Sequence, residues 1–253
     1  MSSGDKDAIY VKDLSKSFGN VQAVQNLSFR VRRGTVFGLL GKNGSGKSTT
    51  AKLLTGLLKP DSGTVFINGC NIGSNLIDVQ KSIGVLSNEM ALIDVLTVWE
   101  HLMLASRAYD ISRDEAEARS EKLLRYFDLW DDRHKYPDQL SVGMYKKASI
   151  AMSLVHNPKI LFLDEPFEGL DPVFIKSICE LIEQLVNKGV TIFLASHFLA
   201  LMQNILNAFV IIDSGKMVYN SDSQDNPEDN RSLEDIFFSF VKTRASTELE
   251  WIG

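Results

Sequence analysis

A glycine-rich run, GKNGSGKST at Gly41–Thr49, limits what this chain can fold into more than any other segment. The residues before it, Val36–Leu40, are apolar and predict a short buried strand, and leucines recur at helical spacing after it. Gly41, Gly44 and Gly46 allow the backbone to take positive φ and to approach a bound group closely, because glycine has no Cβ. The start of the following helix also favours an anion. The sequence therefore predicts a phosphate-binding loop between a strand and a helix.

The pattern G-x-x-x-x-G-K-S within this run is that of the P-loop, and the flanking strand and helix supply its usual context. Lys47 is expected to neutralise charge on the β- and γ-phosphates, and the Ser48 hydroxyl is expected to ligate Mg²⁺. The nucleotide-binding residues predicted in this loop are Gly41, Asn43, Gly44, Ser45, Gly46, Lys47, Ser48 and Thr49. The chain is therefore predicted to bind a nucleoside triphosphate.

The composition is that of a globular protein, with 253 residues, 44% hydrophobic and 23% charged. This length suits one large α/β domain or a domain with an inserted subdomain. The net charge of −5 argues against a broad nucleic-acid-binding face. No apolar run reaches the length of a membrane span, and we expect no secretion signal. Cys70 and Cys179 have no nearby histidine ligands, so reduced thiols are expected rather than a disulfide or metal site.

A second motif, ILFLDEP at Ile160–Pro166, narrows the class of nucleotide enzyme. Its apolar strand delivers Asp164 to the carboxyl end of a sheet, where ligands bind in open α/β folds. There Asp164 is expected to hold Mg²⁺. Glu165 follows at once, where a carboxylate can orient or deprotonate an attacking water.

The rest of the chain predicts alternating strands and helices. Unbroken apolar runs at Ile160–Leu163 and Val190–Leu194 are typical of parallel strands covered on both faces. Residues 112–115 resemble a capping box that opens an exposed helix. Further predictions are strands over 27–32, 64–68 and 82–86, a crossover helix over 176–188, a hairpin from 210–212 and 216–219, and a short helix over 233–242. The expected domains are an ATP-binding core with an antiparallel β subdomain (1–87 and 158–222), a helical subdomain (88–157) and a C-terminal linker with a short helix (223–253).

Four further motifs give the chain a specific resemblance. They are the aromatic Phe18 in KSFG, LSVGM at Leu140–Met144, EGLD at Glu168–Asp171, and His197 after the apolar run TIFLAS. With the P-loop and ILFLDEP, they resemble the nucleotide-binding subunit of an ABC transporter, over nearly the whole length. The segments GTVFGLLG and LTVWEHL resemble segments in the ATPases of export systems whose membrane subunits are separate chains. The resemblance implies an α/β fold: a P-loop NTPase (RecA-like) core with an antiparallel β subdomain and an inserted α-helical subdomain.

The resemblance also implies a role for each matching residue, with ATP and Mg²⁺ as cofactors. Phe18 would stack on adenine, Ser141 and Gly143 would offer a hydroxyl and amides to a γ-phosphate, and Asp171 would lie in the D-loop. His197 would donate a hydrogen bond to the γ-phosphate. The catalytic set is then Lys47, Asn88, Glu165 and His197, and the metal set is Ser48, Asn88 and Asp164.

Two positions depart from the family pattern. Asn88 stands where the family usually has glutamine, so its reach to Mg²⁺ or to water is shorter by one methylene. In the signature motif, Val142 replaces a glycine and Met144 replaces a glutamine, the latter as in a known exporter-type variant. The P-loop, Asp164 and Glu165 match, which favours hydrolysis over mere ATP binding.

In this family the signature serine acts across a dimer that sandwiches two ATP molecules, so one copy of each motif implies a homodimer or a heterodimer of such subunits. The resemblance further implies membrane subunits docked beside 88–102, no nucleic-acid partner, and a peripheral position on the cytoplasmic face of the cell membrane. Two alternatives stay open: a soluble ABC ATPase that drives protein assembly or nucleic-acid remodelling, and a regulatory half-site with little turnover. The cargo is not determined by these motifs.

Overall fold

Two β-sheets organise the computed structural model, which describes residues 7–87, 92–222 and 231–241. The first is an antiparallel sheet in the order β2-β1-β4-β5. Its strands are β1 (Asp7–Phe18), β2 (Val21–Arg32), β4 (Ser62–Ile67) and β5 (Cys70–Asn71). The second sheet has the order β10-β9-β3-β8-β7-β6 and is parallel except for the β9–β10 pair. Its strands are β3 (Val36–Leu40), β6 (Ile83–Leu86), β7 (Ile160–Asp164), β8 (Thr191–Ser196), β9 (Ala208–Asp213) and β10 (Lys216–Asn220).

Three of the four inner strands of this sheet, β3, β8 and β7, are buried along their whole length, as is typical of strands covered on both faces. Successive side chains point to opposite faces, and β3 illustrates the result. Phe37 and Leu39 belong to the hydrophobic core that includes β1 and β2, whereas Val36 and Leu40 belong to the core formed with the helices. The sheet therefore separates two apolar cores.

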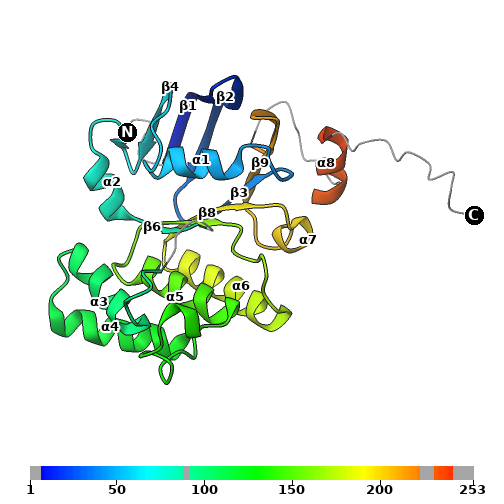
Figure 1. Ribbon diagram of the computed structural model, residues 1–253. Coiled ribbons are helices and arrows are strands. Elements are labelled where there is room, and N and C mark those ends of the chain that lie inside the picture. Colours follow the sequence, from blue (N-terminus) through cyan, green and yellow to red (C-terminus); the bar gives the residue numbers. More distant parts are fainter. Residues whose placement is uncertain (1–6, 88–91, 223–230, 242–253) are drawn as a thin grey trace, which may run out of the picture.

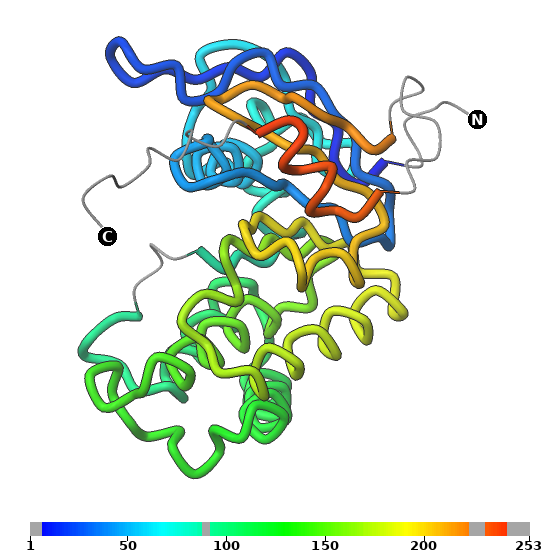
Figure 2. The backbone as a smooth tube through the Cα atoms, turned by 90° about the vertical axis from the view of Figure 1, so that its right-hand side faces the viewer, coloured from blue at the N-terminus to red at the C-terminus, as the bar shows by residue number. Residues whose placement is uncertain are grey.

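Helices cover both faces of the parallel sheet (Figure 1). Helix α1 (Lys47–Leu54) lies between the two sheets and contacts β2, β7 and β8. Helices α3 (Val98–Ala108), α4 (Arg113–Tyr126), α5 (Val142–Leu154) and α6 (Pro172–Asn187) lie on the opposite side. Shorter elements are α2 (Leu76–Ser82), η2 (Pro137–Gln139), α7 (Leu199–Met202) and α8 (Leu233–Phe240). Helix α8 packs against α7 and lies beside β10 (Figure 2). The ring centroids of Phe240 and Tyr219 are 5.1 Å apart.

The predicted strands, the crossover helix and the hairpin are all present, with ends displaced by a few residues. Helices α2 and α7 were not predicted, because seven and four residues are too few for a clear helical period. The predicted capping box at Ser112 was wrong. Ser112 is the N-cap of α4, but its side chain makes no capping hydrogen bond, and Glu115 pairs with Arg119 instead. A true capping box joins Thr97 and Glu100 at the start of α3.

Among the described residues, no helix has the length and apolar character needed to cross a bilayer. The boundaries of the helical subdomain stay a prediction, since 88–91 lie outside the described residues.

Candidate nucleotide-binding and hydrolysis site

The glycine-rich loop joins β3 to α1 in a tightly curved path. Gly44 and Gly46 have φ of 78° and 105°, a region that side chains with a Cβ rarely adopt. Gly41 was expected to share this conformation, but its φ is not positive. A Cβ at Gly41 would lie 2.3 Å from Ser45 Oγ and 2.5 Å from the Ile212 carbonyl oxygen. Glycine is therefore required at Gly41 by lack of space rather than by backbone conformation.

Lys47, the first residue of α1, extends its ammonium group into the curve of this loop. It is 5% exposed, and its Nζ donates to the Gly41 carbonyl oxygen at 2.8 Å. The same nitrogen lies 3.2 Å from Glu165 Oε1. A cavity of about 860 Å³ opens beside this pair and is lined by Asn20, Val21, Gln22, Ala23, Gln25, Asn43, Gly44, Gly46, Lys47, Ser48, Thr49, Glu165, Glu168, Ser214 and Gly215. Most of the predicted loop residues thus line one cavity, whereas Gly41 and the buried Ser45 do not.

The Glu165 carboxylate is held from several directions just beyond the end of β7. Ser196 Oγ donates to Glu165 Oε2 at 2.9 Å, and the His197 backbone N–H donates to the same oxygen at 3.3 Å. The His197 ring nitrogen Nδ1 lies 3.0 Å from Glu165 Oε1. Burial alone would raise the pKa of Glu165, but the contacts with His197, Lys47 and Ser196 outweigh it and lower that pKa. Glu165 is therefore an ionised carboxylate at neutral pH.

Asp164 and Ser48 form a second oxygen cluster next to this carboxylate. Burial raises the pKa of Asp164, while a hydrogen bond with Ser48 opposes that shift. Asp164 Oδ1 is buried and has no hydrogen-bond partner among the described residues. A carboxylate and a hydroxyl beside a phosphate-binding loop are the ligand types that Mg²⁺ prefers. The residues present therefore fit a Mg²⁺ ion, with Asp164 Oδ1 as a free ligand atom.

Sequence reasoning missed Ser196, which is fully buried and fixes Glu165 Oε2. It also accepts a hydrogen bond from the Phe198 backbone at 3.2 Å and so shapes the turn that carries His197. Ser196 ends a predicted buried strand and directly precedes the expected histidine, His197, so its position in the sequence could have indicated a place in the site. The parallel register of β7 and β8 brings Ser196 close to Glu165, because it pairs the residues just before them, Asp164 and Ala195.

The cavity of the glycine-rich loop is not lined by Ser141, Gly143 or Asp171. Ser141 is the N-cap of α5, and its Oγ accepts from the Met144 backbone at 3.2 Å. Asp171 is the N-cap of α6, where it accepts from the Val173 and Phe174 backbones at 3.0 and 2.9 Å. Ser141, Gly143 and Asp171 line one cavity, which shares no residue with the cavity of the glycine-rich loop. The two cavities are therefore separate in a single chain.

One further predicted site residue, Phe18, is not brought to the P-loop cavity. Phe18 is 51% exposed at the end of β1 and does not line that cavity, although Asn20 and Val21 just after it do. Its stacking on adenine stays a prediction. Asn88 lies outside the described residues, so its role also stays a prediction.

Residues 24–168 match the family model described as ABC transporter. This chain belongs to the ABC transporter family. The chain is 33% identical over 210 residues to the linearmycin resistance ATP-binding protein LnrL of Bacillus subtilis, which covers 83% of this chain and 68% of LnrL. It is also 33% identical over 232 residues to the methionine import ATP-binding protein MetN 1 of Bacillus cereus, which covers 87% of this chain and 67% of the relative.

Solved structures of ABC ATP-binding subunits also match this ABC ATPase. An ATP-binding subunit of an ABC transporter matches with a TM-score of 0.85 and 32% identity, over 93% of this chain and 100% of the other. The dimeric ATP-binding cassette MJ0796 in a post-hydrolysis state, bound to ADP and phosphate, matches with a TM-score of 0.78 and 25% identity, over 84% of this chain and 97% of the cassette. The P-loop NTPase fold and the assignment as an ATP-binding, ATP-hydrolysing cassette are therefore confirmed.

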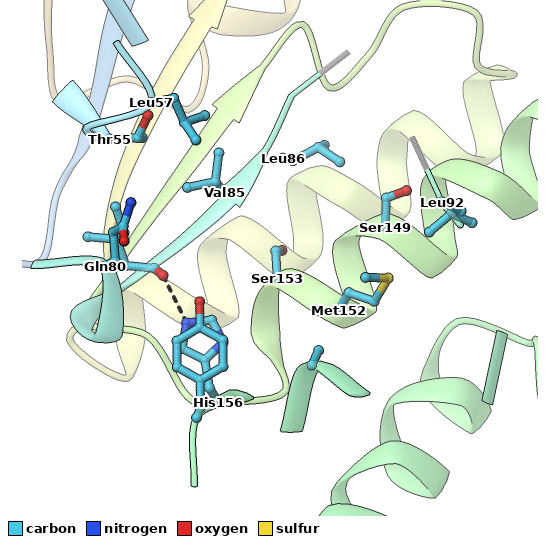
Figure 3. Close-up of a pocket in the computed structure, with 13 residues that line it drawn as sticks. Thr55, Leu57, Gln80, Val85, Leu86, Leu92, Ser149, Met152, Ser153 and His156 are labelled. Atoms are coloured by element: carbon cyan, nitrogen blue, oxygen red, sulfur yellow. Dashed lines mark hydrogen bonds between the residues drawn. The ribbon is translucent and has the colours of Figure 1, made fainter. Parts of the chain in front are cut away.

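The ABC ATPase also carries an apolar cleft between β6 and the helical layer (Figure 3). Its volume is about 340 Å³, and its lining residues are Thr55, Leu57, Gln80, Ile83, Val85, Leu86, Leu92, Ala105, Tyr109, Ser149, Met152, Ser153 and His156. Leu57 is 59% exposed at its rim, whereas Leu92 is buried. His156 stacks on Tyr109, with ring centroids 3.7 Å apart, and its Nε2 lies 2.8 Å from the Ile83 carbonyl oxygen.

Proposed function

We propose that this ABC ATPase is the motor subunit of an exporter whose membrane subunits are separate chains. The observation that carries the hydrolysis part of the proposal is the Glu165 carboxylate. It is ionised, and it is buried within contact distance of Lys47 and His197, next to the Mg²⁺-compatible pair Asp164 and Ser48. A merely ATP-binding site has no need for a carboxylate held in this way.

Each residue of this site then has a chemical role. The loop amides and Lys47 bind the phosphates and offset their charge. Mg²⁺, held by Ser48 and Asp164, would neutralise charge that develops on the phosphate oxygens. Glu165 orients the attacking water and accepts its proton, as an ionised carboxylate can. His197 is 34% exposed at its side chain and lies beside Glu165, where its ring can donate a hydrogen bond to the terminal phosphate.

The dimer part of the proposal is supported by the separation of the two half-sites. Ser141 offers a helix N-terminus and a hydroxyl, yet it lines a cavity distinct from the one that holds Lys47. A second copy, or a related chain, could bring its Ser141 face against the P-loop cavity of the first. The nucleotide would then lie between two chains, and hydrolysis would remove much of the contact that joins them.

The membrane part of the proposal is supported by the apolar cleft and by the relatives. The expected docking residues divide into two groups: Ile93 and Val95 are 48% and 77% exposed, whereas Leu92 and Val98 are buried. Exposed apolar side chains beside a cleft suit a short amphipathic helix from a membrane subunit. Such docking would place the chain on the cytoplasmic face of the cell membrane.

The direction of transport is proposed from the relatives' names. Relatives named for linearmycin resistance, daunorubicin resistance and bacitracin transport favour export, while others are named for methionine import. The motifs that resembled export systems point the same way.

A pair of substitutions at Ser141 tests the shared site. Asp and Asn both cap helices well, so Ser141→Asp and Ser141→Asn should preserve α5. The added negative charge of the aspartate would repel a γ-phosphate presented by the other chain. In a Glu165→Gln background that slows hydrolysis, size-exclusion chromatography with ATP should show dimers for Ser141→Asn and only monomers for Ser141→Asp.

Two controls complete the test. ATP affinity of the monomer should be the same for both Ser141 variants, and Lys47→Ala should lose ATP binding and with it the dimer. Glu183→Gln, an exposed charge change on α6, should match the unmodified background. Equal dimer formation by Ser141→Asp and Ser141→Asn would contradict the proposed arrangement.

A further inference from the structure

The first turns of α5 make contacts that the proposed function does not use. Lys146 lies on α5, five residues after the N-cap Ser141, and its side chain is only partly exposed. Its Nζ donates to the Glu165 carbonyl oxygen at 2.9 Å and lies 3.4 Å from the Glu168 carbonyl oxygen. One ammonium group thus spans the turn that follows β7.

That turn holds Glu165 in an unusual conformation. Glu165 has φ of 47°, which is uncommon for a residue with a side chain and persists only where the surroundings hold it. Its backbone N–H donates to the Ala195 carbonyl oxygen at 2.8 Å. Its carbonyl oxygen accepts from Lys146 and, more weakly at 3.4 Å, from the Glu168 backbone. The direction of the Glu165 side chain therefore depends on contacts of the two peptide groups that flank its Cα.

The charges around Lys146 offset part of the cost of burying it. Burial lowers the pKa of Lys146, and the acidic side chains of Glu168, Glu165 and Asp164 reduce that shift without reversing it. Lysine suits two diverging carbonyl oxygens because its ammonium carries three donors on a long stem. An uncharged side chain of similar length would bury the stem but leave both carbonyl oxygens without this donor.

Tyr145, the residue before Lys146, contacts a segment that lines the apolar cleft. Tyr145 Oη accepts from the Leu92 backbone N–H at 2.5 Å, and Leu92 lines that cleft. Consecutive residues of α5 therefore contact the cleft segment and the Glu165 turn, on the helix whose N-terminus carries Ser141.

We propose that Lys146 is a positioning residue that fastens the turn bearing Glu165 to α5. A displacement of α5, caused by a nucleotide at Ser141 or by a partner in the cleft, would then change the orientation of Glu165 in the same chain. Each nucleotide site would thus respond to the occupancy of the other. This inference rests on the proposed role of Glu165 in hydrolysis.

The test compares Lys146→Met, Lys146→Arg and Lys122→Met in the full chain. Lys122 is an exposed lysine on α4, so it is a matched control for the loss of one surface charge. Lys146→Met should lower kcat roughly 10–100-fold, the size expected when a catalytic group is misplaced, with KM and ATP affinity unchanged. Lys146→Arg should restore most of the rate, because arginine keeps the charge and the donors. Lys122→Met should behave as the unmodified chain.

A double-mutant cycle separates positioning from general damage. If Lys146 acts through the Glu165 carboxylate, Lys146→Met should have little further effect on the residual rate of Glu165→Gln. Equal losses in both backgrounds would overturn the inference, as would a Lys146→Met kcat equal to that of the unmodified chain.

Hydrogen exchange provides a readout that needs no turnover. Amides of the peptide 165–170 should exchange faster in Lys146→Met than in Lys122→Met, and equal protection would overturn the inference. The proposed function fails separately, if the unmodified chain releases phosphate no faster than Glu165→Gln. The two failures are therefore distinguishable.

Discussion

Replacing Glu165 with glutamine keeps the shape of the side chain but removes the charge that faces Lys47. Ser196 and the His197 backbone both donate to Glu165 Oε2, so the amide oxygen of a glutamine should take that position. Its NH₂ group would then point toward Lys47 Nζ, which lies 3.2 Å from Oε1 in the unmodified chain. The NH₂ group of the glutamine would then face the Lys47 ammonium group, which faces a carboxylate oxygen in the unmodified chain.

The effect on stability follows from burial, since Lys47 and Glu165 are only 5% and 7% exposed. Breaking a buried pair typically costs about 3–5 kcal/mol, because one charge is left uncompensated. Lys47 keeps its hydrogen bond to the Gly41 carbonyl oxygen, so we expect the lower end, about 3 kcal/mol. For a chain of this size that corresponds to a fall in Tm of roughly 6–12 °C without nucleotide. ATP should narrow this difference, because its phosphates supply negative charge to Lys47.

The effect on turnover is larger. Loss of a general base typically costs about 10²–10⁴-fold in rate, or roughly 3–5 kcal/mol in the activation barrier. Phosphate release and thermal unfolding, each measured with and without ATP, check both parts. Turnover equal to that of the unmodified chain would refute the role of Glu165 as the base. An unchanged Tm without ATP would refute the reasoning on the buried pair.

Three other predictions concern single positions. Gly46→Ala should lose about 1–3 kcal/mol or more of stability and should weaken ATP binding, because φ at this position is 105° and the new Cβ would lie 2.4 Å from the Ala23 carbonyl oxygen. Denaturant unfolding measures the stability and nucleotide titration measures the ATP affinity. Values equal to those of the unmodified chain would contradict this prediction. Burial lowers the pKa of His156, so the unfolded chain binds this proton more tightly and stability should fall as the pH drops below about 6.5. His156→Phe should therefore show a shallower loss of unfolding free energy between pH 7 and pH 5, measured with urea at each pH, and parallel curves would exclude His156 as the source. Asn88→Gln should preserve or raise turnover if its amide performs the usual glutamine role, whereas a collapse in the phosphate-release rate would mean that the site requires the shorter side chain.

Local patterns predicted much of the fold and the part of the P-loop cavity that the glycine-rich loop and Glu165 form. The strand, loop and helix around Gly41–Thr49 are contiguous in the chain, so their geometry follows from nearby residues. The same holds for β7, which delivers Asp164 and Glu165 to the end of the sheet. Prediction was weakest for very short helices and for side-chain contacts such as the expected capping box at Ser112.

Contacts between distant segments could not be predicted in this way. Ser196 holds Glu165 because β7 and β8 are neighbours in register, and a local pattern carries no information on which strands pair. Lys146 meets the same turn because α5 packs beside it, 19 residues earlier in the chain.

The sequence by itself determined that this chain has a phosphate-binding loop and a strand ending in two acids, because each depends on residues within a few positions of one another. Only the tertiary structure decided that Glu165 stays ionised although it is buried, because Lys47, Ser196 and His197 surround it, and that Ser141 faces a cavity of its own. Burial, charge pairing and the direction of a cavity arise when separate segments come together, and so they depend on the order of the strands and the packing of the helices.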